Sequence, residues 1–320
     1  MNLIDEAVII EVLGIRMYAF GLYVMLGALC GVLILAVAGR VFPLKKGTAP
    51  LTACLALLLG FVVSRLVFCL LNQELGKMTP LSFWPQVSGG GWSMIGLIGG
   101  VFLAGWISAK IQKEKTGRIL DALCLSVLPV IAIERIGESR IEDFDISRPL
   151  DSAFLSRSFL AVGEEEPCLA TYYVAAAVAV VLFVVMAFRW KHTEREGDLT
   201  IVFLLLFGAA SIITESLRYD RFLSISFVGL QQVAAAIMVA LGVILAVVRS
   251  NRPKSVLSLL ALGSILFMVG AVIFLEFKLD RSTWNKLAIY AGMILVVAAP
   301  AGLGLKLLNR GTKRSVYTQE

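Results

Sequence analysis

Charge and histidine are scarce in this sequence. Only 16% of its 320 residues are charged, whereas about a quarter is usual for a soluble domain, and 58% are hydrophobic. The single histidine, His192, lies in the polar segment FRWKHTEREGD, which indicates a solvated residue at a membrane interface. The formal net charge of +6 is small and spread over short polar segments, so it favours membrane orientation over nucleic-acid binding.

The cysteines lack the spacing of a metal site or of a disulfide framework. Four of the five lie in apolar runs; the set is Cys30, Cys54, Cys69, Cys124 and Cys168. The first 16 residues contain acidic side chains and no early basic cluster, which is not typical of a cleavable signal peptide. We therefore expect no metal, no cofactor and no disulfide-stapled fold.

Long apolar runs dominate what remains. A helical run of about 20 apolar residues matches the hydrocarbon thickness of a bilayer. The runs predict an all-α, polytopic integral membrane protein with about nine transmembrane helices. They cover residues 17–38, 51–72, 94–112, 119–134, 170–189, 199–215, 227–248, 255–275 and 286–306.

The connections between these runs alternate in charge. Basic residues follow the odd-numbered runs, as in RVFPLKK after the first and KIQKEKTGR after the third. The positive-inside rule therefore predicts an N-terminus outside and a C-terminus in the cytoplasm. The long acidic connection at about 139–168 then lies outside, and its length predicts a small external head or a rim helix.

The most informative segment is LPVIAIERIGESRIEDFD, from Leu128 to Asp145. An apolar run ends here in charged residues, beginning with Glu134 and Arg135. An arginine at the end of a membrane span is a functional candidate, because it needs a partner or a wet cavity. The alternative is a solvated loop that begins one turn earlier.

Other polar residues interrupt or end the spans. Arg65 interrupts the second span, and Glu215 and Arg218 end the sixth on one helical face. Gln232 enters the seventh span at the same predicted membrane face. Several guanidinium groups in one leaflet suit a phospholipid phosphate, which a guanidinium fork binds with paired hydrogen bonds. The alternative is a set of structural ion pairs with Glu134 and Glu215.

Glycines open the third span in the segment GGGWSMIGLIGG, from Gly89 to Gly100. Such a segment suits a flexible or re-entrant turn. Gly96 and Gly99 let either another helix or a lipid approach the backbone closely. Helix packing and a ligand-facing backbone both remain open from the sequence.

Several segments, in order, resemble the prolipoprotein diacylglyceryl transferase family between residue 14 and about 248. Each segment is weak evidence alone, and their order makes the resemblance specific. The segments are AFGLYVMLG, GFVVSRLVFCLLN, GGGWSMIGLIGG, Asp121 with Pro129, ERIGES, ITESLRYD and LQQVAAAIMVALG.

The resemblance implies a multi-pass enzyme of the bacterial cytoplasmic membrane. Such enzymes transfer a diacylglyceryl group from phosphatidylglycerol to the cysteine thiol of a lipoprotein precursor. By this analogy Arg135 is the leading phosphate contact, and Arg218 with Arg65 supports it. Glu215 orients an arginine. The same analogy places the substrate-binding positions at Gly96, Gly99, Gly137, Glu138 and Gln232.

The sequence departs from the family pattern at four polar positions. Phe20 stands where the family has a tyrosine, and Met94 stands where it has a histidine or tyrosine. Glu138 replaces an asparagine, and Ser211 replaces an arginine. An anionic Glu138 beside a lipid phosphate repels it unless it is protonated or paired with Arg135 or Arg140. Whether catalysis is retained is therefore left open.

The resemblance and the departures from it leave three candidate functions. The first is a phospholipid-dependent transferase with an altered donor or acceptor. The second is a catalytically impaired relative that binds phospholipid or a lipoprotein-like membrane partner. The third, a transporter-like module, lacks the inverted repeat that would support it.

The last part of the chain has no counterpart in the family pattern. We expect a family core at 1–250 and, at 251–320, two additional transmembrane helices with a cytoplasmic tail. The segment EFKLDRSTWNK is predicted to be a short external loop between these helices, with Trp284 as an interfacial anchor.

Overall fold

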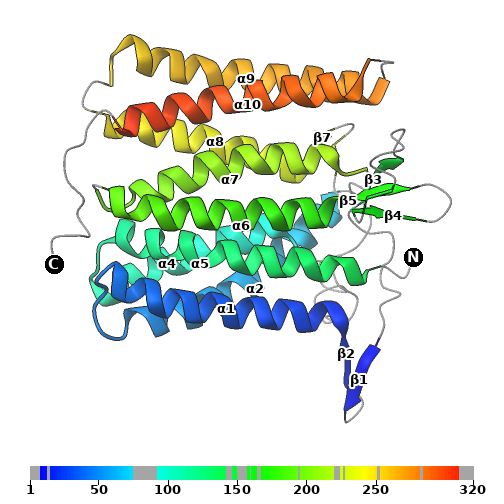
Figure 1. Cartoon of the computed structure of the whole chain (residues 1–320). Coiled ribbons are helices and arrows are strands. Elements are labelled where there is room, and N and C mark those ends of the chain that lie inside the picture. The colour runs from blue at the N-terminus through cyan, green and yellow to red at the C-terminus, as the bar shows by residue number, and fades with distance from the viewer. Residues whose placement is uncertain are drawn as a thin grey trace. The chain divides into compact units, whose positions relative to one another are not determined.

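The fold was analysed in a computed structural model, which describes residues 8–12, 15–74, 92–141, 146–149, 157–158, 160–163, 167–193, 195–219, 224–225, 228–250, 253–281 and 284–309. Nine long α-helices run through these described ranges (Figure 1). They are α1 (Ala19–Val41), α2 (Thr48–Glu74), α4 (Met94–Gln112), α5 (Thr116–Gly137), α6 (Thr171–Arg189), α7 (Asp198–Leu217), α8 (Leu230–Arg249), α9 (Val256–Arg281) and α10 (Lys286–Asn309).

The helices confirm the predicted all-α membrane class. Eight of them are long and apolar enough to cross a bilayer. The exception is α5, which coincides with the fourth predicted span but carries Asp121, Glu134 and Arg135. Most of its residues are buried, including Asp121, so other helices shield its polar groups from lipid.

The chain divides into two compact units, at residues 1–183 and 184–320, with the boundary inside α6. In the first unit α1 packs against α5, and α2 packs against α4. Small residues allow the second pairing. A Cβ atom on Gly100 would lie 2.3 Å from the carbonyl oxygen of Leu59 in α2, so the two backbones are in direct contact.

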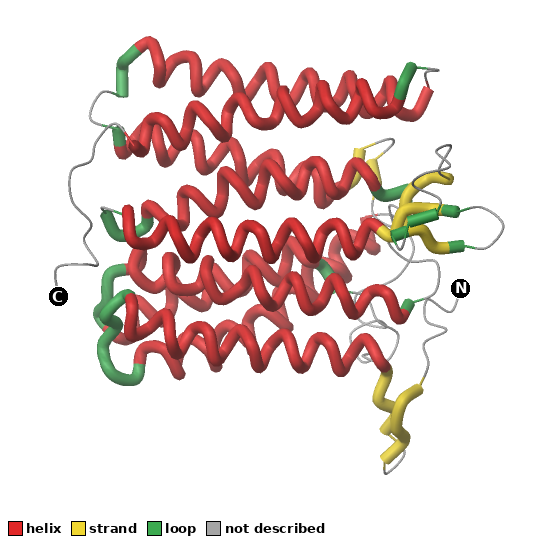
Figure 2. Tube along the Cα trace, viewed as in Figure 1, coloured by secondary structure: helices red, strands yellow, loops and turns green. Residues whose placement is uncertain are grey.

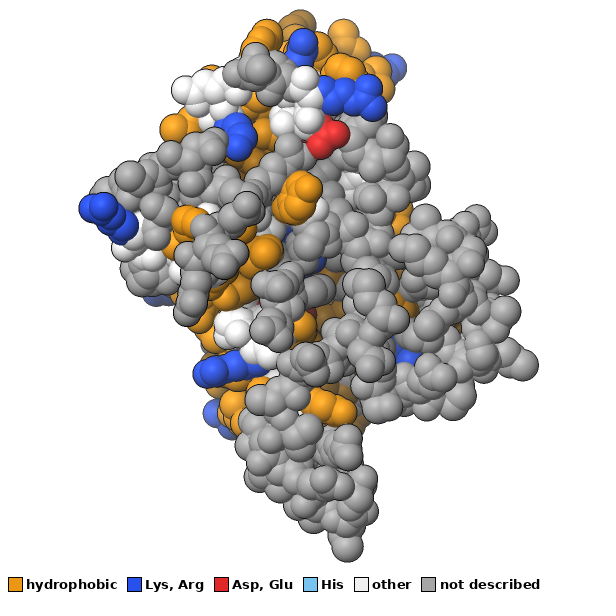
Figure 3. All heavy atoms as spheres, turned by 90° about the vertical axis from the view of Figure 1, so that its right-hand side faces the viewer, with side chains coloured by type: hydrophobic (Ala, Val, Ile, Leu, Met, Phe, Trp, Pro, Cys, Tyr) orange, Lys and Arg blue, Asp and Glu red, His pale blue; other side chains and the backbone are white. Residues whose placement is uncertain are grey.

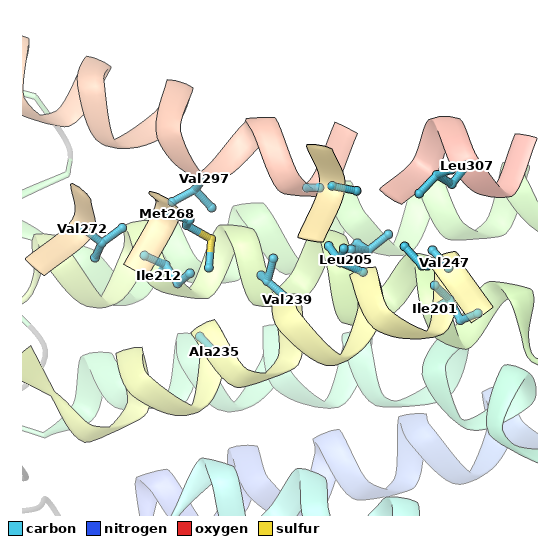
Figure 4. Packing of buried hydrophobic residues seen from close by; sticks show 14 of the residues in the cluster. Ile201, Leu205, Ile212, Ala235, Val239, Val247, Met268, Val272, Val297 and Leu307 are labelled. Carbon is cyan, nitrogen blue, oxygen red and sulfur yellow. The ribbon is translucent and has the colours of Figure 1, made fainter. Parts of the chain in front are cut away.

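The second unit is built around an apolar cluster shared by α7, α8, α9 and α10 (Figure 4). Leu205 of α7, Val239 of α8, Met268 of α9 and Val297 of α10 are all buried in it. The buried residues of α8 recur every three or four positions, from Gln232 to Val247, which is the pattern of one helical face. The two additional helices therefore pack on this face of the family-like core.

Short strands lie next to the helix ends (Figure 2). The hairpin of β1 (Val8–Val12) and β2 (Ile15–Tyr18) leads directly into α1. The predicted external head contains the 3-10 turn η2 (Glu138–Arg140) and an antiparallel sheet of order β3-β5-β4. The strands are β3 (Ile146–Pro149), β4 (Ala161–Val162), β5 (Cys168–Ala170) and, before α8, the pair β6 (Ser224–Ile225) and β7 (Val228–Gly229).

The basic connections of each unit gather at one end of that unit. In the first, Lys45 donates through Nζ to the carbonyl oxygens of Gln112 and Lys113, 3.3 and 2.6 Å away, so the α1–α2 and α4–α5 connections meet. In the second, Arg249 pairs with Asp198, with 2.5 Å between Nη1 and Oδ1. This clustering is what the alternating charge pattern requires, although the side that faces the cytoplasm stays a prediction.

The expected loop EFKLDRSTWNK is mostly helical, which corrects the prediction. The helix α9 continues to Arg281, because Glu276 is buried within the unit and not solvated. Lys278 lies over the Trp284 ring, with Nζ 5.1 Å from its centroid, which ties the end of α9 to the turn that follows. Arg281, the last residue of α9, and Lys286, the first residue of α10, are exposed. Figure 3 shows basic side chains on the surface at its top.

Candidate functional site

Arg135 is buried at the last turn of α5 and is held by carboxylates from its own helix end. Its Nη1 donates to both oxygens of Glu138, each 2.9 Å away. Its Nε lies 3.8 Å from Oε2 of Glu134. Both Arg135 and Glu138 are more than nine-tenths buried. The ion pair therefore forms where water screens charge weakly, so it orients the guanidinium strongly.

The turn after Arg135 packs closely against α1. A Cβ atom on Gly137 would lie 2.6 Å from Cβ of Tyr23 and 3.3 Å from a ring carbon of Phe20, so only glycine fits without a shift. The exposed Arg140 hydrogen-bonds to the Tyr23 side chain, which raises the pKa of Arg140 above its usual value. Tyr23 thus fixes the position of the segment that carries Arg135, Glu138 and Arg140.

Arg65 is fully buried in α2, with 1% of its surface exposed. Its guanidinium carbon lies 5.3 Å from the ring centroid of Trp92, whose ring also contacts Phe61 at 4.6 Å between centroids. The flat guanidinium face is therefore used by an aromatic ring, a favourable cation–π arrangement.

The start of α4 is tied to α2 beside Arg65. The Ser64 hydroxyl donates to the carbonyl oxygen of Ser93 at 2.8 Å and accepts the backbone N–H of Ser93 at 2.9 Å. The Ser93 hydroxyl in turn accepts the N–H of Gly96 as an N-cap. These bonds hold the described end of the glycine-rich segment in one place against α2; Gly89 to Gly91 lie outside the described residues.

The two glycines named as substrate contacts have different surroundings. A Cβ atom on Gly96 would lie 2.6 Å from the Cα atom of Ser64, so its lack of a side chain is needed for α2 to approach α4. Gly99 is exposed, and no atom lies within 4 Å of a Cβ built on it. Its open surroundings leave room for a lipid chain.

In the second unit, Glu215 and Arg218 lie at the end of α7. Their side chains pair with 3.7 Å between Oε2 and Nη1, as their spacing of three residues predicts. Both are more than nine-tenths buried. The pair holds Glu215 beside the Arg218 guanidinium, and the orienting role that the family resemblance implies for Glu215 stays a prediction.

Gln232 meets a carboxylate from one of the additional helices. Its Nε2 donates to Oε1 of Glu276 in α9 at 2.7 Å and to the carbonyl oxygen of Ile212 in α7 at 3.4 Å. Gln232 and Glu276 are each only 2% exposed. Tyr290 of α10 donates to the carbonyl oxygen of Ser216 in α7 at 3.4 Å. The additional helices therefore supply a carboxylate to Gln232 and a hydroxyl to the backbone of the last turn of α7.

A family model described as prolipoprotein diacylglyceryl transferase matches residues 7–248, which is most of the chain. The chain belongs to this family. A search of the curated proteins finds no match to it. The model ends at α8, so α9 and α10 with Glu276 and Tyr290 lie beyond the part that the prolipoprotein diacylglyceryl transferase family describes.

The site residues predicted from the resemblance to the diacylglyceryl transferases are found in both units. Arg65, Gly96, Gly99, Arg135, Gly137 and Glu138 belong to the first unit, and Glu215, Arg218 and Gln232 to the second. Within the first, the replaced position Phe20 lies against Gly137 of the ERIGES segment. Within the second, Ser211 lies one helical turn before Glu215 in α7.

Sequence reasoning did not identify Tyr23, Trp92 or Glu276 as site neighbours. The sequence could have indicated Tyr23, because it lies three residues after the replaced position Phe20 and hence on the same face of α1. The sequence could also have indicated Glu276, since a carboxylate at the edge of an apolar run is costly unless it has a partner. Trp92 follows the three glycines directly, and the sequence could not distinguish a tryptophan that contacts the site from one that anchors the protein at the membrane interface.

Proposed function

We propose that the protein is a bacterial cytoplasmic-membrane enzyme that transfers a diacylglyceryl group from a glycerophospholipid to the cysteine thiol of a lipoprotein precursor. Its membership of the prolipoprotein diacylglyceryl transferase family supports this proposal. The observation that carries it is Arg135, a buried guanidinium at the end of α5 within the ERIGES segment that resembles the family. A buried cation is what a departing phosphate requires.

The proposed chemistry divides between the thiol and the phosphate. The thiolate sulfur attacks the glyceryl carbon that carries the phosphate, and the carbon–oxygen bond breaks with its electron pair leaving on the phosphate. Arg135 binds the phosphate as charge develops on it, and the family resemblance makes Arg65 and Arg218 the candidates for further guanidinium donors. Glu215 orients Arg218 through their ion pair. The thiol proton passes to solvent.

A transfer assay tests this function directly. Purified protein in nanodiscs of mixed phosphatidylglycerol and phosphatidylethanolamine is incubated with a cysteine peptide of lipoprotein type, and mass spectrometry follows the peptide. We expect a peptide heavier by one diacylglyceryl group, lost in Arg135→Gln and retained in Arg40→Gln. Arg40 is an exposed control in the last turn of α1, whereas the segment that carries Arg135 packs near the first turn of that helix. No lipidated peptide would reject the transferase function.

A second function, phospholipid binding without transfer, is favoured by the Arg135–Glu138 pair. Both oxygens of Glu138 already accept from the guanidinium that the reaction needs. Removing one phosphate-stabilising donor costs about 3 kcal/mol of transition-state stabilisation. This function predicts tight lipid binding with no lipidated peptide, so turnover that depends on Arg135 contradicts it.

A further inference from the structure

One face of α9 carries aromatic and basic side chains at the end of the helix. Its members stand three, four and seven residues after the first, which places them on one side of an α-helix. They are Phe274, Phe277, Lys278 and Arg281. Both aromatic rings and Arg281 are exposed, and Lys278 is partly exposed. Glu276, which is buried against Gln232 of α8, lies on the other side of the helix.

Each cation of this face lies over an aromatic ring. Nζ of Lys278 is 5.6 Å from the ring centroid of Phe274 and 5.1 Å from that of Trp284, an exposed residue in the turn after α9. The guanidinium carbon of Arg281 is 5.3 Å from the ring centroid of Phe277. An aromatic ring attracts a cation but carries no net charge, so these contacts hold the cations in place without neutralising them. We call these five residues the cationic surface of α9.

Positive charge exceeds negative charge in this part of the chain. The sequence from Lys278 to Lys286 contains three basic residues and one acidic residue, Asp280. Asp280 is exposed, and successive residues of a helix are about 100° apart around its axis, so Asp280 lies beside the cationic surface and not on it. An anion that approaches the exposed face of α9 therefore meets Lys278 and Arg281.

The length of α9 places the cationic surface at the membrane boundary. Its 26 residues extend for about 39 Å, whereas the hydrocarbon core of a bilayer is about 30 Å thick. Earlier in the helix the exposed side chains are apolar, with Leu266 79% and Phe267 64% exposed. Charged side chains avoid hydrocarbon, and tryptophan prefers the interface. The cationic surface therefore lies at the level of the lipid phosphates.

The contacts favour an anionic lipid over a zwitterionic one. The phosphate of either lipid can accept hydrogen bonds from Lys278 and Arg281. In phosphatidylcholine an ammonium follows the phosphate closely, and the aromatic rings that could bind it already contact protein cations, which repel it. Phosphatidylglycerol brings no positive charge, so its phosphate gains the attraction of both cations without this repulsion.

We propose that the cationic surface of α9 binds the phosphate of an anionic glycerophospholipid from the surrounding leaflet. Lys278 and Arg281 donate to the phosphate, and Trp284 holds Lys278 at the level of the headgroups. The residues involved lie beyond the family match, which ends at residue 248. The site does not depend on the proposed transfer reaction, because the lipid held here is a bound ligand and not a substrate.

Headgroup photocrosslinking tests this site. The full chain in phosphatidylcholine nanodiscs receives a small fraction of phosphatidylglycerol with a diazirine in its headgroup, and mass spectrometry locates the adducts after irradiation. We expect adducts on the segment from Phe277 to Tyr290. The double variant Lys278→Gln with Arg281→Gln should give about tenfold fewer there, because each basic residue near an anionic lipid surface contributes about fivefold to binding. Phosphatidylcholine with the same diazirine should label this segment weakly in both proteins.

The matched control removes two basic residues elsewhere in the same pair of helices. Lys254 precedes α9 and Lys306 lies in the last turn of α10, and both are exposed. Lys254→Gln with Lys306→Gln lowers the net charge equally and is expected to keep the wild-type yield on the segment, which excludes a general effect of charge. Adducts on the other segments serve as the internal reference for folding. No labelling of the segment in the wild type, equal labelling by the two lipids, or unchanged labelling in Lys278→Gln with Arg281→Gln would overturn the proposal.

Discussion

At the scale of single residues, neighbouring glycines of α4 have opposite surroundings. Gly100 faces α2, where a Cβ atom would lie 2.3 Å from the carbonyl oxygen of Leu59 and 2.8 Å from Cα of Gly60. These are backbone atoms, which cannot rotate away. Gly99 faces open space. One glycine therefore sets the distance between helices, and the other leaves the helix surface bare.

This difference predicts opposite effects of alanine at the two positions. Gly100→Ala forces α2 and α4 apart, and we expect it to lower the free energy of unfolding by about 1–3 kcal/mol. Gly99→Ala is expected to be neutral or to raise it by up to about 1 kcal/mol, because alanine favours the helix. Thermal unfolding of the detergent-purified variants measures both. Equal melting temperatures for the two variants would contradict the packing.

Some of these residue contacts can be predicted from the sequence, and others cannot. The pairs Arg135–Glu138 and Glu215–Arg218 are predictable, because residues three apart on a helix or its final turn lie side by side. The contact of Tyr23 with Gly137 is not, because it joins two helices that are far apart along the chain. Local spacing fixes a pair, whereas the packing of whole helices decides which distant groups meet.

At the scale of elements, the helices of the structure confirm the predicted spans to within a few residues, because an apolar run of this length has few alternatives in a bilayer. The end of α9 is the instructive exception. Glu276 ended the apolar pattern, yet the helix continues past it, since Gln232 of α8 supplies a buried partner. The β1–β2 hairpin was not predicted, because strands of four or five residues leave little periodic signal.

The Gln232–Glu276 contact predicts a specific pattern of stability. Gln232→Leu removes the amide donor from a buried carboxylate, and we expect a loss of about 1–3 kcal/mol in the free energy of unfolding. Adding Glu276→Leu removes the carboxylate as well, so the double variant should recover most of that loss. Unfolding in detergent reports both values. A double variant no more stable than Gln232→Leu would contradict this role of the contact.

At the scale of the whole molecule, the positive-inside rule predicts which ends of the helices face the cytoplasm. In a cysteine-free background, a membrane-impermeant maleimide added to intact cells should label Arg157→Cys, in the external head. Lys113→Cys and Lys191→Cys, in two basic connections, should react only after the membrane is opened. All three positions are exposed. Labelling of Lys113→Cys in intact cells would reverse the orientation.

The family resemblance predicts that Arg135 and Arg218 contact one lipid headgroup. Arg135 belongs to the first unit and Arg218 to the second, and each is buried beside its own glutamate. A single headgroup held by both guanidinium groups would couple them energetically, because losing one contact loosens the lipid at the other. Arginines that serve separate structural pairs would act independently.

A double-mutant cycle on lipid affinity distinguishes these cases. Arg135→Gln and Arg218→Gln are each expected to weaken binding of the preferred phospholipid by about tenfold or more. The double variant should lose less than the sum of the two free energies, with a coupling of at least about 0.5 kcal/mol. A parallel cycle of Arg135→Gln with Arg40→Gln should be additive. Arg40 is in the last turn of α1, and the segment that carries Arg135 packs near the first turn of α1. Additive losses for Arg135 and Arg218 would mean that the two arginines do not share a headgroup, and the arginine cluster predicted from the sequence would then not exist as one site.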